Sequence, residues 1–102
     1  MSRLIPALAA TLAGLSSPAQ PDTWAEQKCA LFASAWAEVT DPPPPGLSPG
    51  FTDETDSFIA SGCATGAVCP RSPQDLALAD TLTLMAVAEG MAGSFLPYAC
   101  SD

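Results

Sequence analysis

The segment SPQDLALADTLTLMAVAEGMA, residues 72–92, carries the strongest helix signal in the chain. Ser72 can cap the first turn, Pro73 suits the first helical position, and Asp75 can return a hydrogen bond to the cap. From residue 76 to about residue 92 the sequence is apolar around most of the helix circumference. A helix of this kind is either buried centrally or covered by a partner.

Apolar surface on this helix exceeds what the rest of the chain can cover, because only two shorter helices are expected before it. An uncovered apolar strip would mark an interaction site. The candidate partner-binding side chains are Leu78, Leu82, Met85 and Met91. Gly93 and Pro97 are expected to end the helix. A membrane span is not expected, because acids at positions 75, 80 and 89 interrupt every apolar window of about 18 residues.

An earlier helix is expected to start at the capping box formed by Thr23 and Glu26. Apolar residues then recur at steps of four and three and share one face: Ala25, Cys29, Phe32, Trp36 and Val39. Prolines at positions 42–45 lack amide donors, so this helix must end by Asp41. The proline-rich segment 42–50 is interpreted as a stiff spacer to the next helix.

A second, shorter helix is expected after the spacer, with Thr52 as its cap. Asp53 and Glu54 would then occupy the first turn, where the helix dipole favours carboxylates. Gly62 is a suitable terminator. The acidic cluster at 53–56 lacks the ligand spacing and the glycine of a calcium loop, so we interpret it as a helix start. The apolar side of this helix is formed by Phe51, Phe58 and Ile59.

Residues 1–19 have the pattern of a secretory signal peptide. One positive charge at Arg3 precedes an uncharged run over residues 4–15, and small residues at 17 and 19 offer a cleavage site. A helix over that run is about 18 Å long, too short for a hydrocarbon core of about 30 Å. We expect cleavage after Ala19, which leaves residues 20–102 as a single domain. The alternative is an N-terminal helix buried in the core.

The four cysteines all follow the expected cleavage site and predict a disulfide framework in an oxidising compartment. A zinc site is disfavoured, because the chain has no His and the spacing of Cys63 and Cys69 is too long for a zinc knuckle. Four cysteines allow three pairings. In an up-down-up bundle Cys63 and Cys69 would lie at the same end. We therefore favour Cys63–Cys69 together with Cys29–Cys100.

The composition excludes several classes of function. The chain has 11 acidic and 3 basic residues, a net charge of −8 and no His. This charge disfavours nucleic acid and anionic membranes as partners, because both require clustered cations. The sequence also lacks G-x-S-x-G, S-x-x-K and glycine-rich phosphate motifs. We therefore expect no enzyme activity, no metal and no cofactor.

The sequence predicts an all-α, three-helix protein with two disulfides that binds another exported protein, as an accessory subunit, inhibitor or immunity factor. A basic partner would suit its acidic surface, and self-association as a homodimer is the competing arrangement. Abundant Ala and Pro, little Lys and no Asn are typical of a GC-rich bacterial genome, which favours a periplasmic or secreted location.

Two further hypotheses stay open. In size, helix content and disulfide stapling the chain resembles small periplasmic acid-stress chaperones, with Trp24 followed by Cys29 early in the first helix. That resemblance implies a holdase that exposes apolar surface in acid. The other hypothesis is a carrier for a small hydrophobic ligand. Its lining, which also fits ordinary core packing, would be Met85, Met91, Phe95 and Phe58.

Overall fold

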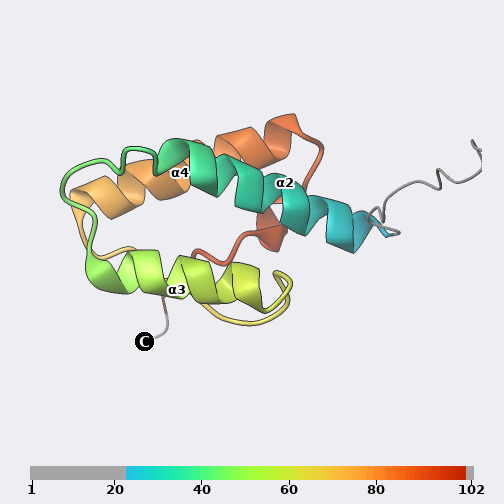
Figure 1. The fold of residues 1–102 in the computed structure, drawn as a ribbon, viewed down its shortest axis with the longest axis horizontal. Helices are drawn as coiled ribbons and strands as arrows, with labels where there is room; N and C mark the ends of the chain where they lie inside the picture. Colours follow the sequence, from blue (N-terminus) through green and yellow to red (C-terminus); the bar gives the residue numbers. More distant parts are fainter. Residues whose placement is uncertain (1–22, 101–102) are drawn as a thin grey trace, which may run out of the picture.

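A computed structural model of the protein describes residues 23–100 (Figure 1). Within this range the chain forms three α-helices and one short 3-10 helix. They are α2 (Trp24–Val39), α3 (Pro49–Ala60), α4 (Pro73–Ala88) and η1 (Gly93–Phe95). The expected all-α, three-helix fold is confirmed, and none of these helices is long and apolar enough to cross a membrane. The expected signal peptide, residues 1–19, lies outside the described residues.

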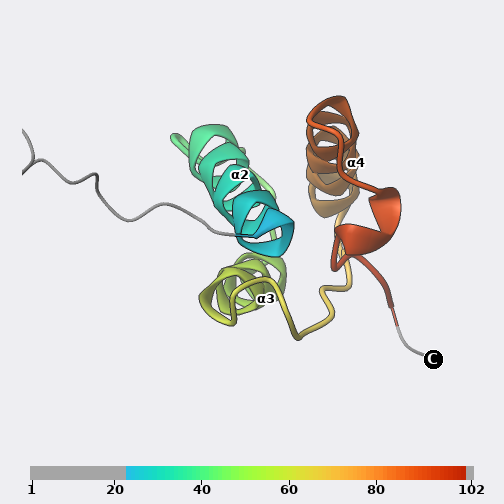
Figure 2. The same ribbon diagram turned by 90° about the vertical axis from the view of Figure 1, so that its right-hand side faces the viewer.

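The three helices do not alternate up, down and up. α2 runs antiparallel to α3, and the segment 61–72 then returns along α3, so that α4 starts at the same end as α3 (Figure 1). Ser72 Oγ fastens the two starts together by donating a hydrogen bond of 2.9 Å to the Gly46 carbonyl. α3 and α4 are consequently parallel. We call residues 61–72 the return segment and the residues after η1 the tail. Together they cover the side between α3 and α4 that α2 leaves open (Figure 2).

Local capping signals set the starts of α2 and α4 as expected. Thr23 Oγ1 accepts a hydrogen bond from the Glu26 amide at 3.0 Å, and the Glu26 carboxylate accepts one from the Thr23 amide at 3.2 Å. Ser72 and Asp75 form the same reciprocal box, with Pro73 in the first turn. These boxes satisfy amides that have no partner within the helix.

The prediction that Thr52 caps the second helix is wrong. α3 begins at Pro49, and Ser48 Oγ accepts a hydrogen bond from the Phe51 amide at 3.3 Å. Ser48 and Pro49 repeat the Ser-Pro start of α4, and a proline at the first helical position needs no amide partner. The acidic cluster at 53–56 therefore lies further along α3, and its carboxylates do not occupy the first turn.

α4 is also shorter than expected, because it ends at Ala88 rather than near residue 92. Gly90 has a φ of 90°, a left-handed conformation that glycine adopts without steric cost. The Met91 amide then donates to the Ala86 carbonyl at 2.9 Å, as in a helix that ends on a glycine. This turn folds the chain back and buries Met91 against the helix end.

An aromatic cluster joins the helices to the tail. Phe32 of α2 meets Phe58 of α3 and Phe95 of η1 edge to face, with centroid distances of 5.7 and 6.0 Å. Phe51 of α3 stacks on Tyr98 of the tail at 5.5 Å. Aromatic pairs of this kind contribute about 0.5–1.5 kcal/mol each beyond the burial of their area. The tail is thus an integral part of the core.

The tail is fastened to the return segment by two backbone hydrogen bonds. The Val68 amide donates to the Pro97 carbonyl at 2.9 Å, and the Ala99 amide donates to the Val68 carbonyl at 3.0 Å. Val68 is fully buried at this junction. The pairing places Cys69 next to Cys100, the residues that follow Val68 and Ala99.

Two disulfides are confirmed, but the favoured pairing of the cysteines is wrong. Cys29 is bonded to Cys63 and Cys69 to Cys100, with Cα–Cα distances of 5.4 and 4.5 Å. The favoured pairing assumes that α4 runs antiparallel to α3. The return segment instead carries Cys69 away from the end of α3, while Cys63 stays beside α2. One bond therefore joins α2 to the start of the return segment, just after α3, and the other joins the far part of that segment to the tail.

Candidate functional site

The predicted partner-binding side chains mostly face the core. Leu78, Leu82 and Met91 are 7%, 1% and 4% exposed, and Met85 is partly buried. Leu78 and Leu82 belong to the core cluster around Phe32. The exposed apolar surface of α4 is therefore formed by other side chains.

Three large apolar side chains of α4 point outward. Leu76, Leu84 and Val87 are 56%, 71% and 53% exposed, and we call them the α4 apolar face. They share this face with Asp80, at steps of four, four and three residues. Because α4 is apolar around most of its circumference, its sequence does not show which side faces the core. These three exposed side chains were therefore not predicted. The position of Asp80, a charge in the middle of the helix, is the signal that marks the outward side.

A groove of about 270 Å³ lies between α2 and α4, and we call it the α2–α4 groove. Glu38 and Glu89 are the acidic residues among its lining, and Ala88 lies at its α4 edge. Ala88 is one helical turn from Leu84, so the groove adjoins the α4 apolar face. The larger apolar side chains of the groove are Leu31 and Phe32 on α2, and Leu82, Met85 and Met91 on and after α4.

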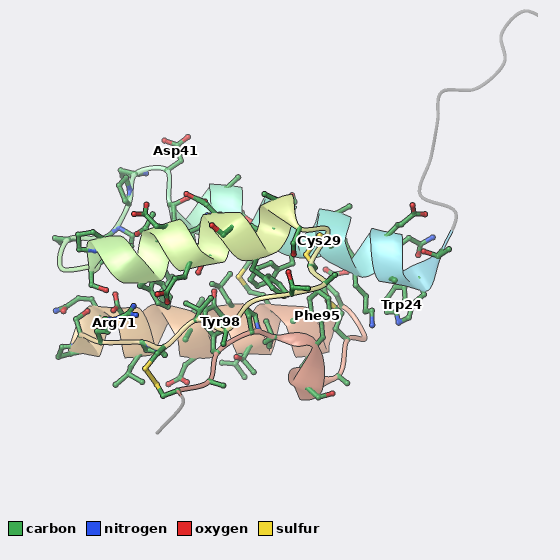
Figure 3. All side chains as sticks on the ribbon, turned by 90° about the horizontal axis from the view of Figure 1, so that it is seen from below. Trp24, Cys29, Asp41, Arg71, Phe95 and Tyr98 are labelled. Atoms are coloured by element: carbon green, nitrogen blue, oxygen red, sulfur yellow. A yellow bond between two sulfur atoms is a disulfide. The ribbon has the colours of Figure 1, made fainter. Side chains whose placement is uncertain are left out.

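The charge of the groove is negative. Glu38 and Glu89 are exposed, and neither has a cation within ion-pair distance in residues 23–100. The two cations of that range are engaged elsewhere. Lys28 Nζ lies 5.1 Å from an aromatic centroid of η1, and Arg71 holds Glu54 with two hydrogen bonds of 2.8 and 3.2 Å. Figure 3 shows Arg71 at the opposite end of the helices from Trp24, the first residue of α2.

The acidic cluster at 53–56 is used largely within the protein. Hydrogen bonds from Arg71 lower the pKa of the Glu54 carboxyl. Asp56 accepts a hydrogen bond of 2.8 Å from the indole Nε1 of Trp36. Two of the carboxylates therefore connect α3 to the return segment and to α2. In the described part of the chain, no three His, Cys, Asp or Glu side chains gather to hold a metal ion.

Asp75 is a buried carboxylate, the kind of group that can mark a catalytic site. It accepts hydrogen bonds from the amide and Oγ of Ser48 at 2.9 and 2.6 Å, and from the amides of Arg71 and Ser72 at 2.8 and 3.1 Å. Burial raises the pKa of this carboxyl, but these hydrogen bonds outweigh burial and lower it to about 2. These hydrogen bonds fix the starts of α3 and α4. Asp75 has no exposed surface, so a substrate cannot reach its carboxylate.

The side chains predicted to line a ligand cavity lie in two places. Met85 and Met91 line the α2–α4 groove. Phe58 is buried in the core, and Phe95 packs against Phe32. The structure therefore brings two of these four side chains together at one groove, where Met85 is partly exposed and Met91 is buried.

Compared with known proteins, the chain matches no family model, no curated protein and no solved structure.

Proposed function

We propose that this is a small, non-catalytic exported protein that binds another exported protein through the α4 apolar face and the adjoining α2–α4 groove. One observation carries the proposal: Leu84 is 71% exposed in a helix whose opposite face is core. A leucine in this position adds little to the packing of the monomer. Covering it with a partner is favourable by about 25 cal/mol per Å² of apolar area.

Charge indicates the kind of partner. The chain has a net charge of −8. Asp80 lies within the α4 apolar face, and Glu38 and Glu89 lie in the groove beside it. This potential would steer a basic protein toward the surface and make association faster at low salt.

The proposal includes an exported location and a role without catalysis. The two disulfides are typical of an oxidising compartment, and the pattern of residues 1–19 supports export. An accessory subunit, an inhibitor or an immunity factor acts through a binding surface and needs no reaction centre.

Substitutions on the exposed face test the proposal. Leu84→Ser together with Val87→Ser should abolish capture of the partner from a periplasmic or culture fraction, because they remove apolar contact area without touching the core. Trp24→Ser is the matched control, since Trp24 is also large, apolar and about half exposed but lies at the start of α2. The proposal is refuted if the double variant captures the same proteins as the wild type, or if the wild type captures none.

Self-association is the competing way to cover the α4 apolar face. Two copies would bring Asp80 and the groove carboxylates of both chains together, and like charges oppose that contact. We expect a monomer by sizing chromatography at micromolar concentration. A dimer that Leu84→Ser dissociates would replace the outside partner with a second copy.

A small hydrophobic ligand is the second candidate, because Met85 and Met91 line a groove of about 270 Å³. That volume is near the lower end for small-molecule sites. Native mass spectrometry of the protein purified without detergent tests this candidate. A bound apolar compound at a fixed ratio would favour a carrier over a protein-binding role.

A further inference from the structure

We propose that the α2–α4 groove binds one face of a basic amphipathic helix of the partner, with an apolar side chain on its floor and a cation at each end. This inference rests on the function proposed above and names the chemistry of the partner. It is carried by the placement of Glu38 and Glu89 relative to the apolar floor of the groove.

The two carboxylates lie at opposite ends of the groove. On α2 the groove extends from Leu31 to Glu38, and on α4 from Leu82 to Glu89 at its end. Because these helices are antiparallel (Figure 1), Glu38 lies at the Leu82 end and Glu89 at the Leu31 end. Seven residues of helix measure roughly 10 Å, so the carboxylates bracket a floor about two helical turns long.

The floor between the carboxylates is apolar and adaptable. Met85 is partly exposed and contributes a flexible, polarisable side chain of the kind frequent on surfaces that bind helices, while Met91 lies buried at the base of the groove. Ala35 and Ala86 are small and leave room above the floor. A side chain of the size of Leu or Phe can therefore pack on the floor of the groove against Met85.

Glu38 and Glu89 lie on facing helices, so they are offset across the groove, by about the 8–10 Å between packed helix axes, as well as along it. Residues i and i+7 of a helix share one face at a separation of about 10 Å, and residues i+3 and i+4 lie between them on that face. In a helix that crosses the groove obliquely, the long side chains of Lys or Arg at i and i+7 would extend toward Glu38 and Glu89. Leu or Phe at i+3 and i+4 would then face the methionines.

A second copy of this chain matches the groove less well than a basic helix does. Within residues 23–100, Lys28 lies over aromatic rings and Arg71 is paired with Glu54. A second copy therefore has no pair of cations at the required spacing. A neutral apolar ligand would use the floor but leave both groove carboxylates without a counter-charge.

The probe for this inference is a synthetic helical peptide with two lysines seven positions apart and leucines between them. The chain has three methionines, of which Met85 and Met91 line the groove and Met1 lies in the expected leader. Methyl ¹³C-methionine NMR of the full chain therefore reports directly on the groove. We expect the Met85 and Met91 signals to shift as the peptide is added; the exported protein, expected to begin after Ala19, gives no other methionine signal.

Single-charge variants test the role of the carboxylates. Glu38→Gln and Glu89→Gln should each weaken peptide binding about two- to fivefold at low salt, as expected for the loss of one exposed ion pair. Asp53→Asn removes one exposed charge from α3 and should leave the affinity unchanged. A peptide of the same composition with its lysines side by side should also bind more weakly.

Several results would overturn the inference. They are an absence of methionine shifts, equal affinity of the wild type and both Gln variants, or shifts caused by octanol but not by the peptide. The proposed function fails separately. If Leu84→Ser with Val87→Ser abolishes partner capture while the two Gln variants leave capture and peptide binding intact, the inference is wrong and the proposed function stands.

Discussion

The carboxylate of Asp75 holds Ser48, 27 residues earlier in the chain, through both its amide and its hydroxyl group, at 2.9 and 2.6 Å. Ser48 caps α3 and Asp75 lies in the first turn of α4. One buried side chain therefore fixes the parallel arrangement of two helix starts. The groove depends on this arrangement, because it places α4 antiparallel to α2.

Replacing Asp75 with Asn should lower the free energy of unfolding by about 3 kcal/mol. An amide has one acceptor oxygen where the carboxylate has two, and its NH₂ group would face backbone donors in a buried site. Urea denaturation followed by circular dichroism measures the change. Asp80→Asn, at an exposed position of the same helix, should change stability by less than about 0.5 kcal/mol. Equal midpoints for the two variants would contradict the structural role of Asp75.

Stability should decrease in acid with the titration of Asp75. Its pKa is about 2 in the folded protein against an ordinary value of 3.8. Since folding lowers this pKa, the stabilisation is complete above the ordinary value and is lost as the pH falls through 3.8 toward about 2. The loss amounts to about 2 kcal/mol. Denaturation curves at pH 6 and pH 2.5 should show it, and Asp75→Asn should reduce the difference.

The same measurement bears on the acid-stress chaperone hypothesis. A holdase needs loosened packing and exposed apolar surface in acid. We expect a native near-UV circular dichroism signal at pH 4, where Asp75 is still ionised. Dye binding together with loss of that signal at pH 4 would support a holdase and contradict the stabilisation assigned to Asp75.

Leu82 and Leu84 should respond oppositely to substitution, although they are two residues apart. Leu82→Ala should destabilise the protein by about 2–5 kcal/mol, because Leu82 is 1% exposed and its truncation would leave a cavity in the core. Leu84→Ala should change stability by less than about 0.5 kcal/mol and weaken partner binding. Thermal unfolding and the capture assay separate the two effects. A large loss of stability for Leu84→Ala would show that this leucine serves folding.

Each disulfide should contribute about 3–4 kcal/mol, since the bonds close loops with sequence separations of 34 and 31 residues. Replacing either pair with Ser should lower the free energy of unfolding, measured by urea denaturation, by a comparable amount. A peptide map without reduction should recover Cys29 with Cys63. A fragment that joins Cys63 to Cys69 would contradict the topology of the return segment.

Features set by neighbouring residues were predictable from the sequence. The capping boxes of α2 and α4 and the buried stripe with Phe32 and Trp36 all depend on spacings of three or four residues. The start of α3 was missed because Thr52 precedes two acids and gives a plausible cap, whereas Ser48 draws its role from Asp75 in another helix.

The cysteine pairing and the exposed surface depend on tertiary structure. The direction of the return segment decides which cysteines meet, and no local pattern encodes that direction. The outward side of α4 was likewise hidden by its uniform apolar sequence. Only packing against α2 separates Leu82 in the core from Leu84 on the surface.

The tail that stacks Tyr98 on Phe51 also sets the order of events during synthesis. The ribosome makes residues 93–100 after all three helices, so Phe51 and Val68 have no cover on that side until the tail has been made. The nascent polypeptide therefore cannot close its core early. On the proposed export route, this delay would favour passage of the chain in an unfolded state, and Cys69 can join Cys100 only after both have reached the oxidising side.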